Sequence, residues 1–95
     1  MNPEQKKRVT IRYCTRCNWL LRAGWMAQEL LSSFGETLGE VALIPDDTGG
    51  KFEIRVGDQV VWERVRDGGF PESKDLKKRV RDIVDPDRYM GHVDA

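Results

Sequence analysis

The two cysteines of the chain, Cys14 and Cys17, stand three positions apart, where a strand pattern ends and a helix pattern begins. The first turn of a helix brings side chains i and i+3 together, so we expect the two sulfurs to close a small disulfide ring. A helix N-terminus carries a partial positive charge that favours the thiolate, and Arg16 between the cysteines adds to that potential. Because the thiolate is the form that attacks a disulfide, the motif predicts dithiol–disulfide chemistry.

Two other interpretations of the motif stay open. A Cys-x-x-Cys pair is half of a structural zinc site, which needs two further cysteine or histidine ligands. The one histidine, His92, falls in a stretch expected to be a loose tail, so a zinc ion would have to be shared between two chains. The third interpretation is an inert, buried cysteine pair. Catalysis by a histidine inside the fold is not expected, again because of the place of His92.

The elements that position the cysteines follow from the hydrophobic period. Residues 9–13 alternate between apolar and polar side chains, which predicts a strand. Residues 18–34 change to a helical period, and Gly35 is expected to end that helix. Three further strands are expected at residues 40–44, 51–56 and 59–65. A second helix is expected where Leu76, Val80, Ile83 and Val84 keep a helical spacing, and Pro86 ends that pattern.

One face of the first helix is apolar, and its opposite side carries two large apolar residues. The face is made of Trp19, Leu20, Ala23, Met26, Ala27, Leu30, Leu31 and Phe34. Leu21 and Trp25 fall on the polar side, four residues apart and therefore adjacent. We hypothesise that they form an exposed patch, with Phe70, that docks a protein partner or a second copy of the chain. The alternative is that the loop at residues 67–71, through Phe70, covers the pair.

The element order β-α-β-β-β-α predicts an α/β domain with a four-stranded mixed sheet and two helices. A strand–helix–strand start implies a right-handed parallel crossover. Gly57-Asp58 between the last two strand patterns predicts a two-residue hairpin turn, of type II′. The pattern leaves open whether the two helices cover one face of the sheet or both.

Length and composition bound the class of protein. Ninety-five residues predict a single domain over 1–95, with a core at about residues 8–86 between a flexible N-terminus and a flexible tail. Sixteen Lys and Arg balance sixteen Asp and Glu, which argues against a nucleic-acid or anionic-membrane partner. No apolar signal segment follows the basic N-terminus, and two cysteines are too few for a secreted disulfide scaffold. We therefore expect a soluble, cytoplasmic protein.

Several short motifs together resemble a known family. Tyr13-Cys14-Thr15-Arg16-Cys17, the helix at 19–34, Gly49-Gly50-Lys51-Phe52-Glu53 and Gly69-Phe70-Pro71 look like the selenoprotein W/T/H group of thioredoxin-like proteins, the Rdx type. The resemblance covers residues 8–86. It implies a smaller version of the thioredoxin-like core, in which the first strand is central and lies between the second strand and the hairpin. It also implies a redox protein that acts without a cofactor on glutathione or on partner-protein disulfides.

The resemblance and thioredoxin-type reasoning point to different attacking residues. Several animal members of the group carry selenocysteine at the position that matches Cys17, which implies that this atom is the reactive one. Thioredoxin-type reasoning instead takes Cys14 as the more exposed residue, with Cys17 resolving the mixed disulfide. We name both residues and set the expectation toward Cys14.

These inferences give one main functional hypothesis and one alternative from another class. The main hypothesis is a thiol–disulfide redox protein that uses Cys14 and Cys17, with Arg16 favouring the thiolate. The alternative is a non-enzymatic binding or regulatory module, whose dithiol senses oxidation or shares a zinc ion across a homodimer.

Overall fold

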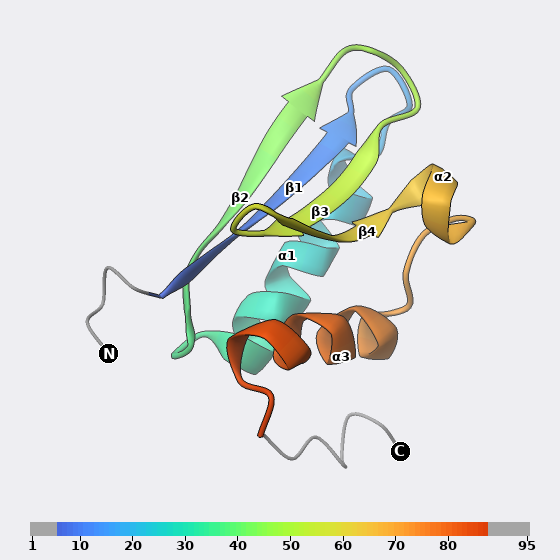
Figure 1. Cartoon of the computed structure of the whole chain (residues 1–95). Helices are drawn as coiled ribbons and strands as arrows, with labels where there is room; N and C mark the ends of the chain where they lie inside the picture. The colour runs from blue at the N-terminus through green and yellow to red at the C-terminus, as the bar shows by residue number, and fades with distance from the viewer. Residues whose placement is uncertain (1–5, 88–95) are drawn as a thin grey trace.

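The computed structural model describes residues 6–87, and it has the expected order of strands and long helices (Figure 1). The predictions for the two ends of the chain and for His92 fall largely on residues 1–5 and 88–95, outside the described residues. The elements are β1 (Lys7–Cys14), α1 (Leu20–Phe34), β2 (Leu38–Asp46), β3 (Phe52–Val56), β4 (Gln59–Glu63), α2 (Arg64–Asp67) and α3 (Ser73–Val84).

The sheet has the order β2-β1-β3-β4, so the strand that ends in Cys14 is an inner strand. β1 pairs in parallel with β2 and antiparallel with β3, and Ile11 lies opposite Leu43 on one side and Ile54 on the other. β3 and β4 form the predicted hairpin. Gly57 has a φ of 58° and Asp58 does not have a positive φ, as a type II′ turn requires. This is the expected mixed sheet of a thioredoxin-like α/β fold.

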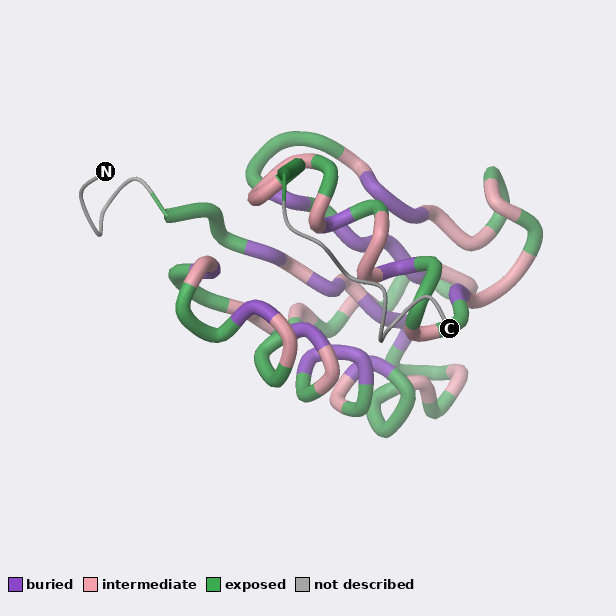
Figure 2. Tube along the Cα trace, turned by 90° about the horizontal axis from the view of Figure 1, so that it is seen from below, coloured by how far each residue is buried: buried purple, intermediate pink, exposed green. Residues whose placement is uncertain are grey.

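Both long helices lie on the same face of the sheet. Ile54 and Trp62 are paired across β3 and β4, and the guanidinium of Arg79 in α3 lies 4.3 Å from the Trp62 ring. Glu29 of α1 accepts hydrogen bonds from the side chains of Ser73 and Lys77 in α3. The buried residues of α1 line the side of the helix that faces the strands (Figure 2). The two helices therefore form one layer over one core.

The opposite face of the sheet is polar. Thr10 and Arg12 of β1 lie beside Arg55 and Glu53 of β3, with their side chains on this face. Burial alone would raise the pKa of Glu53, but the hydrogen bond from Arg55 and the charge of Lys51 outweigh it and hold the pKa below its ordinary value. Because charged and polar side chains cover the face, the domain needs no second helical layer.

The structure corrects the expected apolar face of α1. Ala23, Met26, Ala27, Leu30 and Phe34 are buried as predicted, and Trp19 packs against the core. However, Leu20 is 49% exposed and Leu31 is 45% exposed, so both predictions were wrong. These two residues fall at the edges of the apolar stripe, beyond the width that the sheet covers.

Gly35 follows the last residue of α1, as expected for the end of this helix. Its φ is −57°, which any residue can adopt. A side chain at this position would collide with the backbone, because a Cβ would lie 2.7 Å from the carbonyl oxygen of Leu31. Glycine is therefore required here because it has no Cβ.

The structure adds a third helix to the two that were predicted. The expected last strand ends at Glu63, and the residues after it form the single turn α2. The Glu63 side chain accepts a hydrogen bond from the backbone N–H of Arg66, and Gly68 closes the turn with a φ of 78°. The sequence did not indicate this turn because apolar residues continue the strand pattern up to Val65, although the Gly68-Gly69 stop was visible.

Within residues 6–87, no helix is long and apolar enough to cross a membrane.

Candidate functional site

The two cysteines lie in the connection between β1 and α1. Cys14 is the last residue of β1, a turn covers residues 15–18, and α1 begins only at Leu20. The cysteines form a disulfide with their Cα atoms 5.4 Å apart, within the usual range. The disulfide ring is thus closed by a turn that precedes the helix. The expectation that the first turn of the helix closes it was wrong. Asn18 makes this turn with a φ of 59°, a conformation that asparagine tolerates.

The two sulfurs differ in exposure, in the opposite sense to the expectation. Cys14 is completely buried, whereas Cys17 is partly exposed. Cys14 belongs to an inner strand and is paired with Asp46 of β2, and the N–H of Thr15 continues that pairing to the carbonyl of Asp46 at 2.9 Å. The premise that Cys14 is the more exposed cysteine was therefore wrong, because the strand continues through it.

Three aromatic rings form a cluster that is connected to the cysteine motif, because Phe52 is paired across β1 and β3 with Tyr13, the residue before Cys14. Trp19, two residues after Cys17, lies with its ring centroid 4.9 Å from that of Phe70 and 6.2 Å from that of Phe52. The centroids of Phe52 and Phe70 are 4.9 Å apart, and all three pairs meet edge to face. We call these three residues the aromatic cluster. It joins the start of α1, the start of β3 and the loop before α3.

Two guanidinium groups lie on the aromatic cluster. The Arg22 guanidinium carbon is 4.1 Å from the centroid of Phe70, and that of Arg64 is 5.2 Å from the ring of Trp19. Arg64 also donates from Nε to the carbonyl oxygen of Gly50 at 3.1 Å. Sequence reasoning missed both arginines, because their ring contacts form only in the folded chain. Arg64 is placed near Trp19 by the unpredicted turn α2, and Arg22 is placed by its contact with Phe70.

The other predicted site residues are placed as follows. Arg16 is exposed, and within residues 6–87 no ion pair of this side chain is found. Leu21 is 85% exposed and Trp25 is 49% exposed, so no loop covers the pair. Phe70 is half-buried in the aromatic cluster, where its ring contacts are Trp19 and Phe52.

A polar network holds the turn next to Cys14. Asp46 accepts hydrogen bonds from the backbone N–H and the hydroxyl of Thr48, and it lies 3.5 Å from a guanidinium nitrogen of Arg12. The hydroxyl of Thr48, its N–H and the charge of Arg12 outweigh burial and lower the pKa of Asp46. This carboxylate is thus already occupied by its own neighbours.

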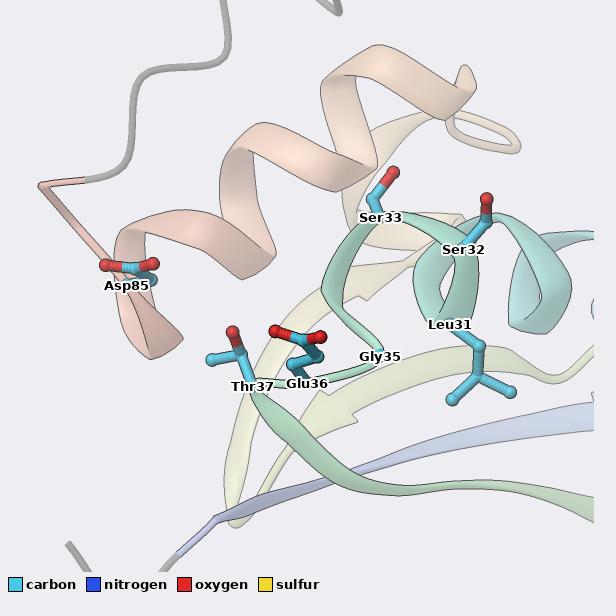
Figure 3. Close-up of a pocket in the computed structure, with 7 residues that line it drawn as sticks. All are labelled: Leu31, Ser32, Ser33, Gly35, Glu36, Thr37 and Asp85. Carbon is cyan, nitrogen blue, oxygen red and sulfur yellow. The ribbon is translucent and has the colours of Figure 1, made fainter.

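A hollow at one end of the helical layer lies away from the cysteines. It has a volume of about 560 Å³ and is lined at the C-terminal end of α1, the turn after it and Asp85 at the end of α3 (Figure 3). Figure 3 shows Asp85 facing Glu36 and Thr37. Since the fifteen residues of α1 span about 22 Å, this hollow is not part of the cysteine site. Among the residues that the structure describes, no histidine or cysteine lines it.

Metal-ligating side chains do not converge elsewhere in the described part of the chain. No group of three or more His, Cys, Asp or Glu residues in it could hold a metal ion.

Comparison with known proteins places this arrangement among relatives. The model of the Rdx family matches residues 8–82. The chain is 31% identical over 80 residues to "Migration and invasion enhancer 1" of Bos taurus, an alignment that covers 83% of the chain and 66% of that protein. It is 31% identical over 74 residues to the protein of the same name from Mus musculus, covering 77% of the chain and 61% of that protein. The chain thus spans a little under two thirds of the length of these relatives.

Two solved structures share both sequence and fold with the chain. A crystal structure of a selenoprotein W-related protein from Vibrio cholerae is 52% identical and has a TM-score of 0.82, covering 85% of this chain and all of that one. A crystal structure of a protein from Bordetella parapertussis is 60% identical with a TM-score of 0.80, covering 82% of this chain and 98% of that one.

Proposed function

The chain belongs to the Rdx family, whose model matches residues 8–82, and from that premise we propose that it is a thiol–disulfide redox protein. The observation that carries the proposal is the Cys14–Cys17 pair, which is at disulfide distance and in which Cys17 is partly exposed. A pair that can close a ring and be reached from outside has what reversible exchange needs.

Cys17 is the attacking residue in this proposal, and Cys14 resolves. The thiolate of Cys17 attacks one sulfur of a substrate disulfide, forming a mixed disulfide and releasing the other half of the substrate as a thiolate, which takes up a proton. Cys14 then attacks the sulfur of Cys17, the bond to the substrate breaks, and the second substrate thiol leaves. Two electrons pass from the dithiol to the substrate, and two thiols of glutathione or of a partner reductase restore the dithiol.

The exposure of the two sulfurs supports this order. A substrate sulfur must approach the attacking sulfur in line, which solvent access permits at Cys17. Cys14 has no exposed surface, so it can reach only a sulfur already bound at Cys17, whose Cα is 5.4 Å away.

Substrates and surroundings belong to the same proposal. Glutathione and disulfides of partner proteins are the substrates, no cofactor takes part, and the cytoplasm is the compartment. Leu21 and Trp25 offer an exposed apolar surface at the start of α1 to a protein partner or a second copy of the chain. Arg16 contributes positive potential that favours the Cys17 thiolate.

Trapping the mixed disulfide tests the proposal. Cys14→Ser and Cys17→Ser proteins are incubated with glutathione disulfide, and the bound glutathione is measured by intact-protein mass. Cys14→Ser should accumulate a stable adduct at least tenfold faster than Cys17→Ser, because only the former keeps the accessible sulfur. Faster trapping by Cys17→Ser would reverse the assigned roles.

The redox role itself is tested on the unmodified chain in graded glutathione buffers. A two-electron transition between the dithiol and the Cys14–Cys17 disulfide, at roughly −120 to −270 mV, is expected for an exchange protein. Thiols that never form the intramolecular disulfide would overturn the function. Stoichiometric zinc in protein purified without chelator would then favour a metal-sharing module.

A further inference from the structure

The arginines of the described residues fall into two groups. Six of them form an ion pair with a carboxylate: Arg8 with Glu40, Arg12 with Asp46, Arg55 with Glu53, Arg66 and Arg79 with Asp67, and Arg81 with Asp82. Arg16, Arg22 and Arg64 form none with any residue of 6–87. These three are the arginines that belong to the turn at the cysteines or touch the aromatic cluster.

Two of these unpaired groups are held in place by contacts that leave their charge unneutralised. The Arg22 guanidinium lies over the Phe70 ring, and the Arg64 guanidinium lies over the Trp19 ring and donates from Nε to Gly50. A guanidinium stacked on a ring keeps its in-plane N–H donors free for an acceptor. Arg22 and Arg64 therefore present oriented donors and positive charge.

The rings that hold these donors are connected to the cysteine motif. Trp19 follows Cys17 by two residues and contacts Phe70, and both guanidiniums therefore rest on rings of one cluster that includes a near neighbour of Cys17 in the chain. Asp46, which is paired with Cys14 across β1 and β2, is occupied by Thr48 and Arg12. Glu63, next to Arg64, accepts a hydrogen bond from the N–H of Arg66. Neither carboxylate is paired with Arg22 or Arg64.

We propose that Arg22 and Arg64 are a carboxylate-recognition pair, which makes the Cys14–Cys17 site selective for thiols and disulfides that bear carboxylate groups. The inference rests on the proposed redox function and names its class of substrate. Planar guanidinium groups bind carboxylates through paired N–H···O bonds, so the fit is to carboxylates near the reacting sulfur. A small anionic thiol and an acidic peptide segment share this chemistry.

The selectivity acts on a balanced exchange. A thiolate attacks the sulfur of Cys17 in the Cys14–Cys17 disulfide, forms a mixed disulfide and releases the thiolate of Cys14. A second thiolate attacks the substrate sulfur of that mixed disulfide, releasing Cys17 and a substrate disulfide. Two thiols are oxidised and the protein disulfide is reduced, and Arg22 and Arg64 hold the carboxylates of the thiols in both steps.

The test compares thiols that differ in charge. The rates at which 3-mercaptopropionate, 2-mercaptoethanol and cysteamine reduce the oxidised protein are measured from the release of protein thiols. The quantity of interest is the ratio of the anionic to the neutral rate in each protein, because the intrinsic reactivity of each thiol cancels between variants. The ratio should fall about threefold in Arg22→Gln and in Arg64→Gln, and close to tenfold in the double variant.

The controls separate local recognition from general charge. Arg8→Gln removes a guanidinium at the far end of β1 and should leave the ratio unchanged (Figure 1). Arg22→Lys keeps the positive charge and should restore part of the selectivity. Far-ultraviolet circular dichroism and unfolding in urea show whether each variant is folded like the unmodified chain, and added salt should weaken the preference in the unmodified chain.

Each further outcome decides one claim. A ratio that does not change in the double variant, or that falls equally in Arg8→Gln, overturns the recognition pair while the redox function stands. No reduction of the disulfide by any of the three thiols overturns the redox function itself. A second arm uses peptide disulfides flanked by Asp or by Lys. If 3-mercaptopropionate is preferred among the small thiols, the substrate class is a small anionic thiol. If only the peptide disulfides flanked by Asp are preferred, the substrate class is an acidic peptide segment.

Discussion

The two sulfurs of the site differ in what can reach them. Cys14 is enclosed because it ends an inner strand, whereas Cys17 lies in the following turn and meets solvent. In the proposed exchange, an outside thiol therefore reaches Cys17 first. Trp19 follows Cys17 by two residues and contacts Phe70, and the guanidiniums of Arg64 and Arg22 lie over these two rings. Small differences in single side chains thus decide which atom reacts and with what.

At the same scale, Trp25→Ala separates a surface role from a core role. Trp25 is 49% exposed, so we expect its truncation to lower the free energy of unfolding by about 1–2 kcal/mol. Phe34→Ala is the matched control, because Phe34 is 1% exposed and should cost about 3–5 kcal/mol. Urea unfolding followed by circular dichroism measures both. A loss above roughly 3 kcal/mol for Trp25→Ala would place Trp25 in the core and leave no exposed patch for a partner.

Among the elements, the short helix α2 has the largest influence on the site for its size. It begins at Arg64, whose guanidinium lies over the ring of Trp19 and donates a hydrogen bond to the carbonyl oxygen of Gly50. Its last residue, Asp67, accepts a hydrogen bond from the backbone N–H of Glu63 and pairs with Arg66 and Arg79. Asp67 thereby joins β4, α2 and α3. Asp67 thus anchors the turn that carries Arg64, one of the two residues of the proposed recognition pair.

The pH dependence of stability tests that anchor. Burial would raise the pKa of Asp67, but the N–H of Glu63 and the side chains of Arg66 and Arg79 lower it from 3.8 to about 2. Because the folded-state pKa is the lower one, the stabilisation is present above about pH 4 and is lost as pH falls toward 2. Asp67→Asn should cost about 1–2 kcal/mol at pH 7 and flatten the stability curve between pH 4 and 2.

A second carboxylate provides the control for this prediction. Asp82 pairs with Arg81 on an exposed part of α3, with 65% of its side chain exposed. Asp82→Asn should change the free energy of unfolding by less than about 1 kcal/mol at any of these pH values. Urea titrations at pH 7, 4 and 2.5 compare the two variants with the unmodified chain. An Asp67→Asn curve parallel to that of the unmodified chain would show that Asp67 does not anchor α2.

At the scale of the whole molecule, one layer of helices covers one face of a four-stranded sheet. α1 packs against β1 and β2, α3 lies against β4, and Glu29 links the two helices. The buried residues form one continuous cluster that includes residues of both helices and all four strands. A core shared in this way predicts that its parts are stable only together.

We therefore expect the chain to unfold in one cooperative step. The transitions in urea followed by far-ultraviolet circular dichroism and by tryptophan fluorescence should coincide, as they do for small single domains. Trp19, Trp25 and Trp62 report on three different places, the aromatic cluster, the outer side of α1 and β4. A fluorescence midpoint well below that of circular dichroism would divide the chain into separately stable parts and contradict the single-domain prediction.

Local patterns in the sequence were enough to determine much of this protein. The Cys-x-x-Cys motif between a strand and a helix, the order of the strands and long helices and the hairpin at Gly57 were all predicted and confirmed. These features depend on residues near one another in the chain, because period and turn chemistry are local properties. The order of strands in the sheet came from the resemblance to the selenoprotein W group and was also confirmed.

Only the tertiary structure decided which sulfur is accessible and which charges stand beside it. Periodicity indicates which side of an element is apolar, but not which neighbours cover it, so Leu20, Leu31 and Cys14 were misjudged. Arg22 and Arg64 are 42 positions apart, and they lie on one aromatic cluster because of their contacts with Phe70 and Trp19. Contacts between residues so distant in the chain leave no local pattern. The sequence therefore determines the reacting pair, and the packing of the elements around it determines its accessibility and its charge.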